Sequence, residues 1–173
     1  MGGGIDTGAD SVLLTNVTVA RNLVGAEAAT RTVRGGGLAV DGGTITLKAT
    51  ILGLNTAPAA GGPNCFGPVA SAGHNVLGAT TGCTFTGKPS DKLHKDPKLG
   101  ALANNGGPTF TLALLDGSPA LDVIPPPLCA VAFDQRGIHG PPGSPVRRGF
   151  VRAGLTTRAP PPGHWRRSPA LRH

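Results

Sequence analysis

The sequence predicts an all-β protein in which short parallel strands stack coil upon coil, a β-solenoid. The composition favours strands and turns over helices, because 28 glycines and 17 prolines separate clusters of Val, Ile, Leu and Thr, and only 3% of the residues are aromatic. One segment repeats at a fixed spacing, which is typical of stacked units that cannot bury their apolar faces alone. Apolar residues alternate within the repeated runs, as they do in half-buried strands.

Residues 1–57 contain two 33-residue repeats and are expected to form the regular coils. The run GGGI at 2–5 returns as GGGL at 35–38. Each is followed by a strand-like run, VLLTNVTVARN at 12–22 and ITLKATILGLN at 45–55. Triple glycines break a helix and permit a tight corner, so the repeat is not one of helical units.

Stacking with this spacing places equivalent residues of the two repeats above one another. Apolar residues of the two strand-like runs then form a column inside the coil. The two asparagines are expected to form an amide ladder at a turn, each side chain bonding the next. Turn propensity alone also accounts for asparagine at these positions. The predicted structural ladder consists of Val12, Leu14, Asn22, Ile45, Leu47 and Asn55.

Residues 58–140 lose the repeat and are interpreted as the last, irregular coils with a C-terminal cap. An uncovered solenoid end exposes strand edges and apolar side chains, so a cap is expected. Its turn residues are predicted to include Asn104 and Asn105, together with the acids Asp122 and Asp134. Arg136 is expected to bond cap carbonyls or Asp134. The candidate apolar residues of the cap are Leu99, Leu102, Phe110, Leu112, Leu114 and Leu121.

Residues 141–173 form a third segment, predicted to be a disordered Arg/Pro-rich tail. The segment holds seven Arg, no Lys and no acid, whereas residues 1–140 hold nine basic and nine acidic residues, so the tail carries the net charge of +7. Such a composition cannot bury enough apolar surface to fold. The rest of the chain offers no basic stripe, aromatic platform or nucleic-acid motif, so no nucleic-acid partner is predicted. The tail is interpreted as out-of-frame translation, the rival being a basic arm for an anionic polymer.

Several motifs follow one another between residues 35 and 137. They are ATILGLNTA (49–57), Cys65, GHNVLG (73–78), GCTFTG (82–87), DPKLGALANNGGPTFTLALLDGSPALD (96–122) and DQRG (134–137). In this order they resemble the C-terminal part of choice-of-anchor Q domain proteins, and the GGGI repeat resembles polymorphic outer-membrane-protein-like repeats. The resemblance implies a bacterial right-handed parallel β-helix (solenoid), secreted or displayed at the cell surface. It implies no activity, because the role of the family is generally unassigned.

The chain has three cysteines, Cys65, Cys83 and Cys129. The resemblance implies a disulfide between Cys65 and Cys83, and it leaves Cys129 as an unpaired thiol. The rival interpretation is a zinc site that adds His74 and His94 to the first two cysteines. The spacing typical of structural zinc sites is missing, so no metal and no cofactor is predicted.

Enzymes that act on polysaccharides with a pectate-lyase-like β-helix need clustered carboxylates. Asp6 and Asp10 lie on one predicted coil, but the 33-residue step places Ala39 and Gly43 above them. No catalytic residue is therefore predicted. The predicted function is a non-catalytic structural or adhesive module that contacts extracellular polysaccharide or a cell-surface glycan. The alternative is a polysaccharide lyase or glycoside hydrolase whose active coils lie upstream.

The start of the chain carries no recognisable export signal, because Met1 precedes a glycine repeat rather than a basic and then apolar region. The chain is therefore expected to be a C-terminal fragment that stacks on upstream β-helix coils. In the resembled family a Cys-Asp-Ile/Val-Gly-Ala-Phe-Glu ending follows DQRG, and a frameshift near residues 138–145 is expected to have removed it. No apolar run approaches the roughly 20 residues of a membrane span.

Overall fold

The computed structural model describes residues 2–8, 10–25, 33–58, 61–125, 128, 131 and 133–138. These residues form an all-β structure with parallel strands, which confirms that part of the prediction. Within the described ranges there are eleven strands and no α-helix. The strands are β1 (Ile5–Thr7), β2 (Ser11–Thr15), β3 (Thr18–Ala20), β4 (Leu38–Val40), β5 (Thr44–Lys48), β6 (Ile51–Gly53), β7 (Cys65–Gly73), β8 (Val76–Leu77), β9 (Cys83–Thr86), β10 (Leu99–Ala103) and β11 (Thr111–Leu114).

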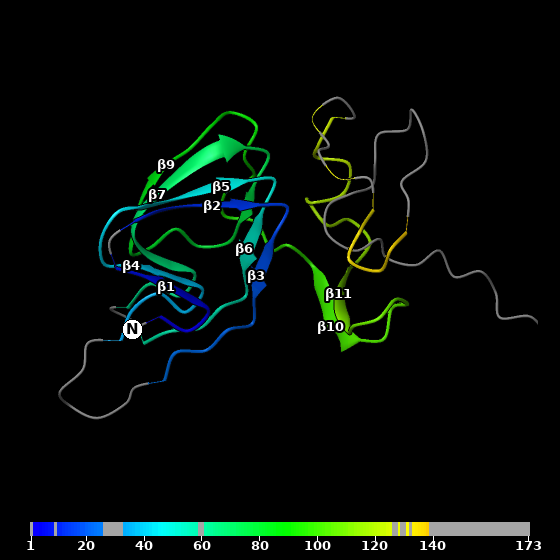
Figure 1. The fold of residues 1–173 in the computed structure, drawn as a ribbon, viewed down its shortest axis with the longest axis horizontal. Coiled ribbons are helices and arrows are strands. Elements are labelled where there is room, and N and C mark those ends of the chain that lie inside the picture. The colour runs from blue at the N-terminus through cyan, green and yellow to red at the C-terminus, as the bar shows by residue number, and fades with distance from the viewer. Residues whose placement is uncertain are drawn as a thin grey trace, which may run out of the picture.

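Parallel strands from successive passes of the chain lie side by side in three stacks (Figure 1). The first stack is β1–β4–β7, the second is β2–β5–β7–β9, and the third is β3–β6–β8. Strand β7 is nine residues long and belongs to the first two stacks, so it joins them at a corner. Figure 1 shows the second stack along the top, the third on the right and the first below. Together they form a nearly closed, barrel-like arrangement around one core.

The core is built from residues that face each other across adjacent passes. Val12 pairs with Ile45 and Leu14 with Leu47, at the spacing of the sequence repeat. Val69 continues the column above Ile45. Full burial of such a side chain contributes about 1.5–3 kcal/mol. The buried members of this cluster are Val19, Leu38, Val40, Ile45, Leu47, Leu52, Cys65, Val69 and Leu77.

The repeated glycines occupy the corner where the third stack leads into the first. A Cβ atom at Gly4 would lie 2.6 Å from the carbonyl oxygen of Gly37 and 2.9 Å from Nδ2 of Asn22. A Cβ atom at Gly37 would lie 2.5 Å from the carbonyl oxygen of Asn64 and 2.7 Å from Nδ2 of Asn55. Such contacts are too short for any side chain, so the corner requires glycine where the backbone and an asparagine side chain meet.

The antiparallel hairpin of β10 and β11 packs against the third stack, and Figure 1 shows it beside β3 and β6. Leu99 and Leu114 are buried and share a cluster with Ile51 and Val76. Residues next to those two on β6 and β8 face the core, so this second cluster lies on the outer side of the stack. A guanidinium nitrogen of Arg21 donates to the carbonyl oxygen of Leu99 at 2.9 Å and ties the hairpin to the first pass.

The prediction that Leu102 and Phe110 belong to the apolar core of the cap is wrong. Leu102 and Phe110 are each 62% exposed. The hairpin has two strands and presents only one face to the third stack, so Leu102 on β10 is left exposed to solvent. Phe110 lies in the loop before β11, outside both strands.

Some predictions fall outside the described residues. The unpaired thiol of Cys129 and the tail of residues 141–173 belong to that part of the chain. Among the described residues, no helix is long and apolar enough to cross a membrane.

Candidate functional site

The outer face of the second stack carries several hydroxyl side chains. On β5 the residues Ile45 and Leu47 are buried in the core, so the alternating Thr44 and Thr46 project outward. On β9 the ring of Phe85 packs toward the core, and the flanking threonines are exposed. The hydroxyl-bearing residues of this face are Ser11, Thr15, Thr44, Thr46, Thr84 and Thr86.

Strand pairing arranges these side chains in rows. Ser11 lies opposite Thr44, and Thr15 lies opposite Lys48. Between these pairs Thr46 lies opposite Leu13, an exposed apolar residue on the same face. Neighbouring strands are about 4.8 Å apart, and alternate residues of one strand are about 6.7 Å apart. Small or apolar residues of β7 separate the β5 row from the β9 row, because Pro68 and Ala70 pair with Thr84 and Thr86. We call the outer side of β2, β5, β7 and β9 the hydroxyl face.

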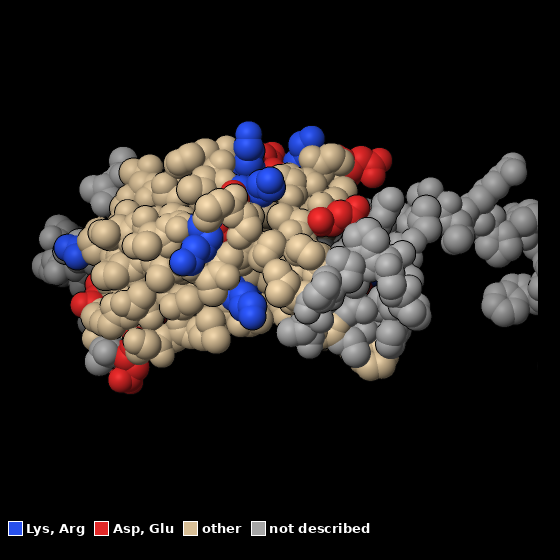
Figure 2. Space-filling view, turned by 90° about the horizontal axis from the view of Figure 1, so that it is seen from above, with Lys and Arg blue, Asp and Glu red and all other residues tan. Residues whose placement is uncertain are grey.

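Figure 2 looks down on the side of the molecule where this stack lies. Uncharged residues cover most of the view, and Lys and Arg side chains stand in small separate groups among them. The motifs TIT (44–46) and TFT (84–86) could have indicated the hydroxyl face from the sequence, because they alternate hydroxyl and buried apolar residues. Sequence reasoning missed this set.

The predicted asparagine ladder is present at the corner after the third stack. Oδ1 of Asn55 accepts hydrogen bonds from the backbone N–H of Asn22 at 2.9 Å and from Nδ2 of Asn22 at 3.0 Å. Nδ2 of Asn55 donates to the carbonyl oxygen of Val19 at 2.9 Å. The ladder therefore satisfies backbone groups that a turn would otherwise leave unpaired in a buried place.

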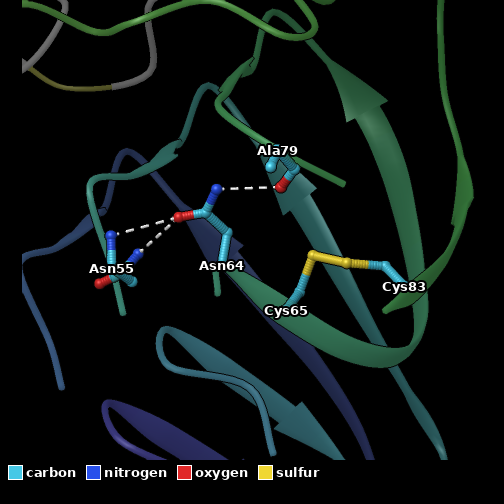
Figure 3. Close-up of a disulfide and its surroundings, with 5 residues drawn as sticks. All are labelled: Asn55, Asn64, Cys65, Ala79 and Cys83. Atoms are coloured by element: carbon cyan, nitrogen blue, oxygen red, sulfur yellow. Dashed lines mark hydrogen bonds between the residues drawn. A yellow bond between two sulfur atoms is a disulfide. The ribbon is translucent and has the colours of Figure 1, made fainter. Parts of the chain in front are cut away.

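A third asparagine extends the ladder, and the sequence repeat did not indicate it. Oδ1 of Asn64 accepts from the backbone N–H and from Nδ2 of Asn55, both at 3.3 Å. Nδ2 of Asn64 donates to the carbonyl oxygen of Ala79 at 2.9 Å, as Figure 3 shows. The next residue, Cys65, is bonded to Cys83 with the Cα atoms 5.4 Å apart. The expected disulfide is present, and the ladder ends beside it.

The disulfide uses the two cysteines that the rival zinc site would need. Cys65 and Cys83 are joined to each other, so neither sulfur is a thiolate that could bind zinc. Nδ1 of His74 lies 2.9 Å from the carbonyl oxygen of Val123. Within the described part of the chain, no three His, Cys, Asp or Glu side chains come together as a metal site would require.

A second polar cluster lies where β7 leads into β8. Oδ1 of Asp91 accepts hydrogen bonds from the hydroxyl of Ser71 at 2.9 Å and from the backbone N–H and Nδ2 of Asn75, both at 3.0 Å. Oδ1 of Asn75 accepts from the backbone N–H of Thr50 at 2.9 Å. Asp91 also accepts from the N–H of Lys88 at 2.7 Å. Four donors bond the carboxylate of Asp91, which makes it a structural group that holds two turns together.

The predicted cap residues hold the hairpin and the DQRG turn. Nδ2 of Asn105 donates to the carbonyl oxygen of Thr111 at 2.8 Å, and Oδ1 of Asn104 accepts from the N–H of Gly106 at 3.0 Å. A guanidinium nitrogen of Arg136 donates to the carbonyl oxygen of Asn105 at 3.1 Å. These contacts join the turn between β10 and β11 to residues near position 136.

Asp134 and Arg136 form an ion pair at 2.7 Å, with side chains 18% and 4% exposed. Burial raises the pKa of Asp134, but the guanidinium of Arg136 and the backbone N–H groups of Ile138 and Arg136 outweigh burial. These hydrogen bonds and the positive charge hold the pKa of Asp134 below its ordinary value. The arginine therefore has the predicted structural contacts with both a carbonyl and Asp134. Asp122 lies in a turn with a positive φ of 55°.

Strand pairing places no carboxylate directly opposite Asp6 among the described residues. Asp6 on β1 pairs with Ala39 of β4, as the repeat spacing predicts. Asp41 follows β4, and its N–H donates to the carbonyl oxygen of Thr7. The described residues thus place no second carboxylate on the strand position next to Asp6, where an acid/base pair or a calcium site would need one.

Comparison with protein-family models, with curated proteins and with solved structures finds no match to this chain.

Proposed function

We propose that this chain is a segment of a right-handed parallel β-helix and serves as a non-catalytic structural or adhesive module of an exported bacterial protein. The observation that carries the proposal is the continuous parallel stacking of three strand positions, with an internal asparagine ladder along one corner. Asn55 and Asn64 are buried, and both side chains donate to backbone carbonyl oxygens of this scaffold. The carboxylates Asp91 and Asp134 are engaged in turns, which supports a structural role for both.

The proposed place is outside the cell. A disulfide between Cys65 and Cys83 supports export, since disulfides persist in oxidising compartments and are rare in the cytosol. The resemblance to choice-of-anchor Q domain proteins is consistent with this place. In support, its separate motifs meet in space where Arg136 of DQRG bonds the carbonyl oxygen of Asn105 in the NNGGP turn.

The proposed ligand is an extracellular polysaccharide or a cell-surface glycan bound on the hydroxyl face. Threonine hydroxyls both donate and accept hydrogen bonds, as sugar hydroxyls do. Extended strands keep the rows straight, so one linear glycan could meet several hydroxyls at regular spacing. Lys48, which pairs with Thr15, adds a positive charge at the end of the rows and favours an acidic glycan.

Isosteric substitution on the hydroxyl face tests this ligand. The variant with Thr44, Thr46, Thr84 and Thr86 all replaced by valine keeps the shape and strand preference of the face and removes four hydroxyls. Affinity electrophoresis in gels cast with acidic or neutral polysaccharides should retard the native chain and not the variant. A matched control replaces Thr80 and Thr81, which lie in the turn before β9, by valine and should bind as the native chain does.

Two outcomes would contradict the proposal. Equal retardation of the native chain and the four-threonine variant would exclude the hydroxyl face as the binding surface. Release of unsaturated sugars from the same polysaccharides, with or without calcium, would contradict the non-catalytic role and favour a polysaccharide lyase.

A further inference from the structure

The strands of the first pass are edge strands in all three stacks. β1, β2 and β3 each stand at one end of the strand order, with a partner on one side only among the described residues. The N–H of Asn16 donates to the carbonyl oxygen of Lys48, and the carbonyl oxygen of Val17 accepts from Ile51. Because parallel strands direct alternate residues to opposite sides, the backbone groups of Leu13, Thr15 and Thr18 point away from the second pass.

The apolar side chains of this pass are covered from one side. Ile5, Val12 and Leu14 are half-buried and pack against the core, whereas their partners Leu38, Ile45 and Leu47 in the second pass are completely buried. The residue types are nearly the same in the two passes. The first-pass residues are less buried because, within the described part of the chain, a strand packs beside them on one side only.

The asparagine ladder has a direction, and its first acceptor is open. Oδ1 of Asn55 accepts two hydrogen bonds from Asn22, and Oδ1 of Asn64 accepts two from Asn55. Each rung thus receives the backbone N–H and the amide of the rung before it. Oδ1 of Asn22 accepts no hydrogen bond from any described residue, although Asn22 is only half-exposed.

We propose that the outer edge of β1, β2 and β3 is a docking surface for one more parallel coil, whose turn asparagine donates its backbone N–H and side-chain amide to Oδ1 of Asn22. The inference deepens the proposed function, on which it rests, by stating what the neighbouring coil must offer. Its strands must run parallel to β1, β2 and β3. Its inward residues must be apolar where Ile5, Val12 and Leu14 are apolar.

A second copy of this chain meets these requirements poorly. A two-fold contact between two such edges would run the strands antiparallel, because the axis reverses the direction of the partner. The amide donors of the copy would then not lie at the spacing of the ladder. The parallel coil satisfies the strand edge, the apolar side chains and the Asn22 acceptor together.

The test extends the full chain by its own first pass. A duplicate of residues 2–34, inserted ahead of Gly2, places an asparagine at the ladder spacing before Asn22. Amide hydrogen exchange is then measured at Leu13, Thr15 and Thr18 in both chains. In the native chain we expect these three amides to exchange fast, and in the extended chain at least about 100-fold more slowly.

Two substitutions distinguish the hydrogen bond to Oδ1 of Asn22 from protection that comes only from covering the edge strands. In the extended chain, Asn22→Ala should raise the exchange rate of Thr18 at least about tenfold more than it does in the native chain. The matched control, Leu23→Ala, changes a neighbouring side chain that is 68% exposed and should leave the rate unchanged. An equal effect of Asn22→Ala in both chains would overturn the proposed contact.

The remaining outcomes are also decisive. Fast exchange of the three amides in the extended chain, with β5 amides protected, would overturn the docking surface and leave the proposed function intact. Fast exchange of the β5 amides would show that the parallel stack itself fails. Protection in the native chain that grows with protein concentration would identify a second copy as the occupant and overturn the inference.

Discussion

Replacing Asn55 by alanine should strongly destabilise this chain, because its side chain is buried and hydrogen-bonded at the corner after the third stack. The side chain is 6% exposed and takes part in four hydrogen bonds. Two run from Asn22 to Oδ1, and two run from Nδ2 to the carbonyl oxygen of Val19 and to Oδ1 of Asn64. Each is worth about 1 kcal/mol net, so Asn55→Ala should lower the free energy of unfolding by about 4 kcal/mol.

Urea unfolding followed by far-ultraviolet circular dichroism measures this loss. The matched variant is Asn22→Ala, which removes only the side-chain donor at the end of the ladder and keeps the backbone donor of residue 22. Its expected cost is about 1 kcal/mol. If the two variants lose the same free energy, or if Asn55→Ala costs less than about 1 kcal/mol, the ladder does not stabilise the corner as argued.

Three further changes have expected outcomes. Cys83→Ser should lower the free energy of unfolding under oxidising conditions by roughly 3 kcal/mol, because it opens a loop with a sequence separation of 18, and reductant should abolish the difference. Ile45→Ala should cost about 3–4 kcal/mol, whereas Leu13→Ala, at 62% exposure, should cost less than about 0.5 kcal/mol in the same urea titration. Asp134 has a lowered pKa in the folded state, so its stabilisation is present above the unfolded value of about 3.9 and is lost as the pH falls through the folded pKa. Carboxyl carbon shifts should show that lowered value, and Arg136→Ala should raise it; an unchanged pKa would contradict the ion pair.

The fixed repeat made the first two passes predictable. Residues such as Val12 and Ile45 share a type and a spacing, and a parallel stack places equal positions of a repeat side by side. The same logic located Asn22 and Asn55 on one corner. Strand alternation then determined which residues of each run face inward, although the threonines on the opposite face were not recognised as a set.

Beyond residue 57 the sequence offered family-like motifs but no spacing from which to calculate contacts. Leu99 and Leu114 were placed correctly in an apolar cluster, whereas Leu102 and Phe110 were not. Apolar character alone does not predict which face of a two-stranded hairpin packs against another element. The bonds of Asp91 to Ser71 and Asn75 were also missed, because no repeat links those residues.

The corner at Asn64 explains why the sequence period ends while the stacking continues. In the first two passes the residue before the first-stack strand is glycine, at Gly4 and Gly37, and in the third pass it is Asn64. The ladder partner of Asn55 therefore comes from the start of a first-stack strand, nine residues later, instead of 33 residues later. The number of residues between passes sets the period in sequence, whereas strand pairing sets the period in space. A shorter segment at this corner ends the 33-residue spacing in the sequence and leaves the strand stacking intact. The adjacent disulfide joins Cys65, where β7 begins, to Cys83, where β9 begins in the next pass.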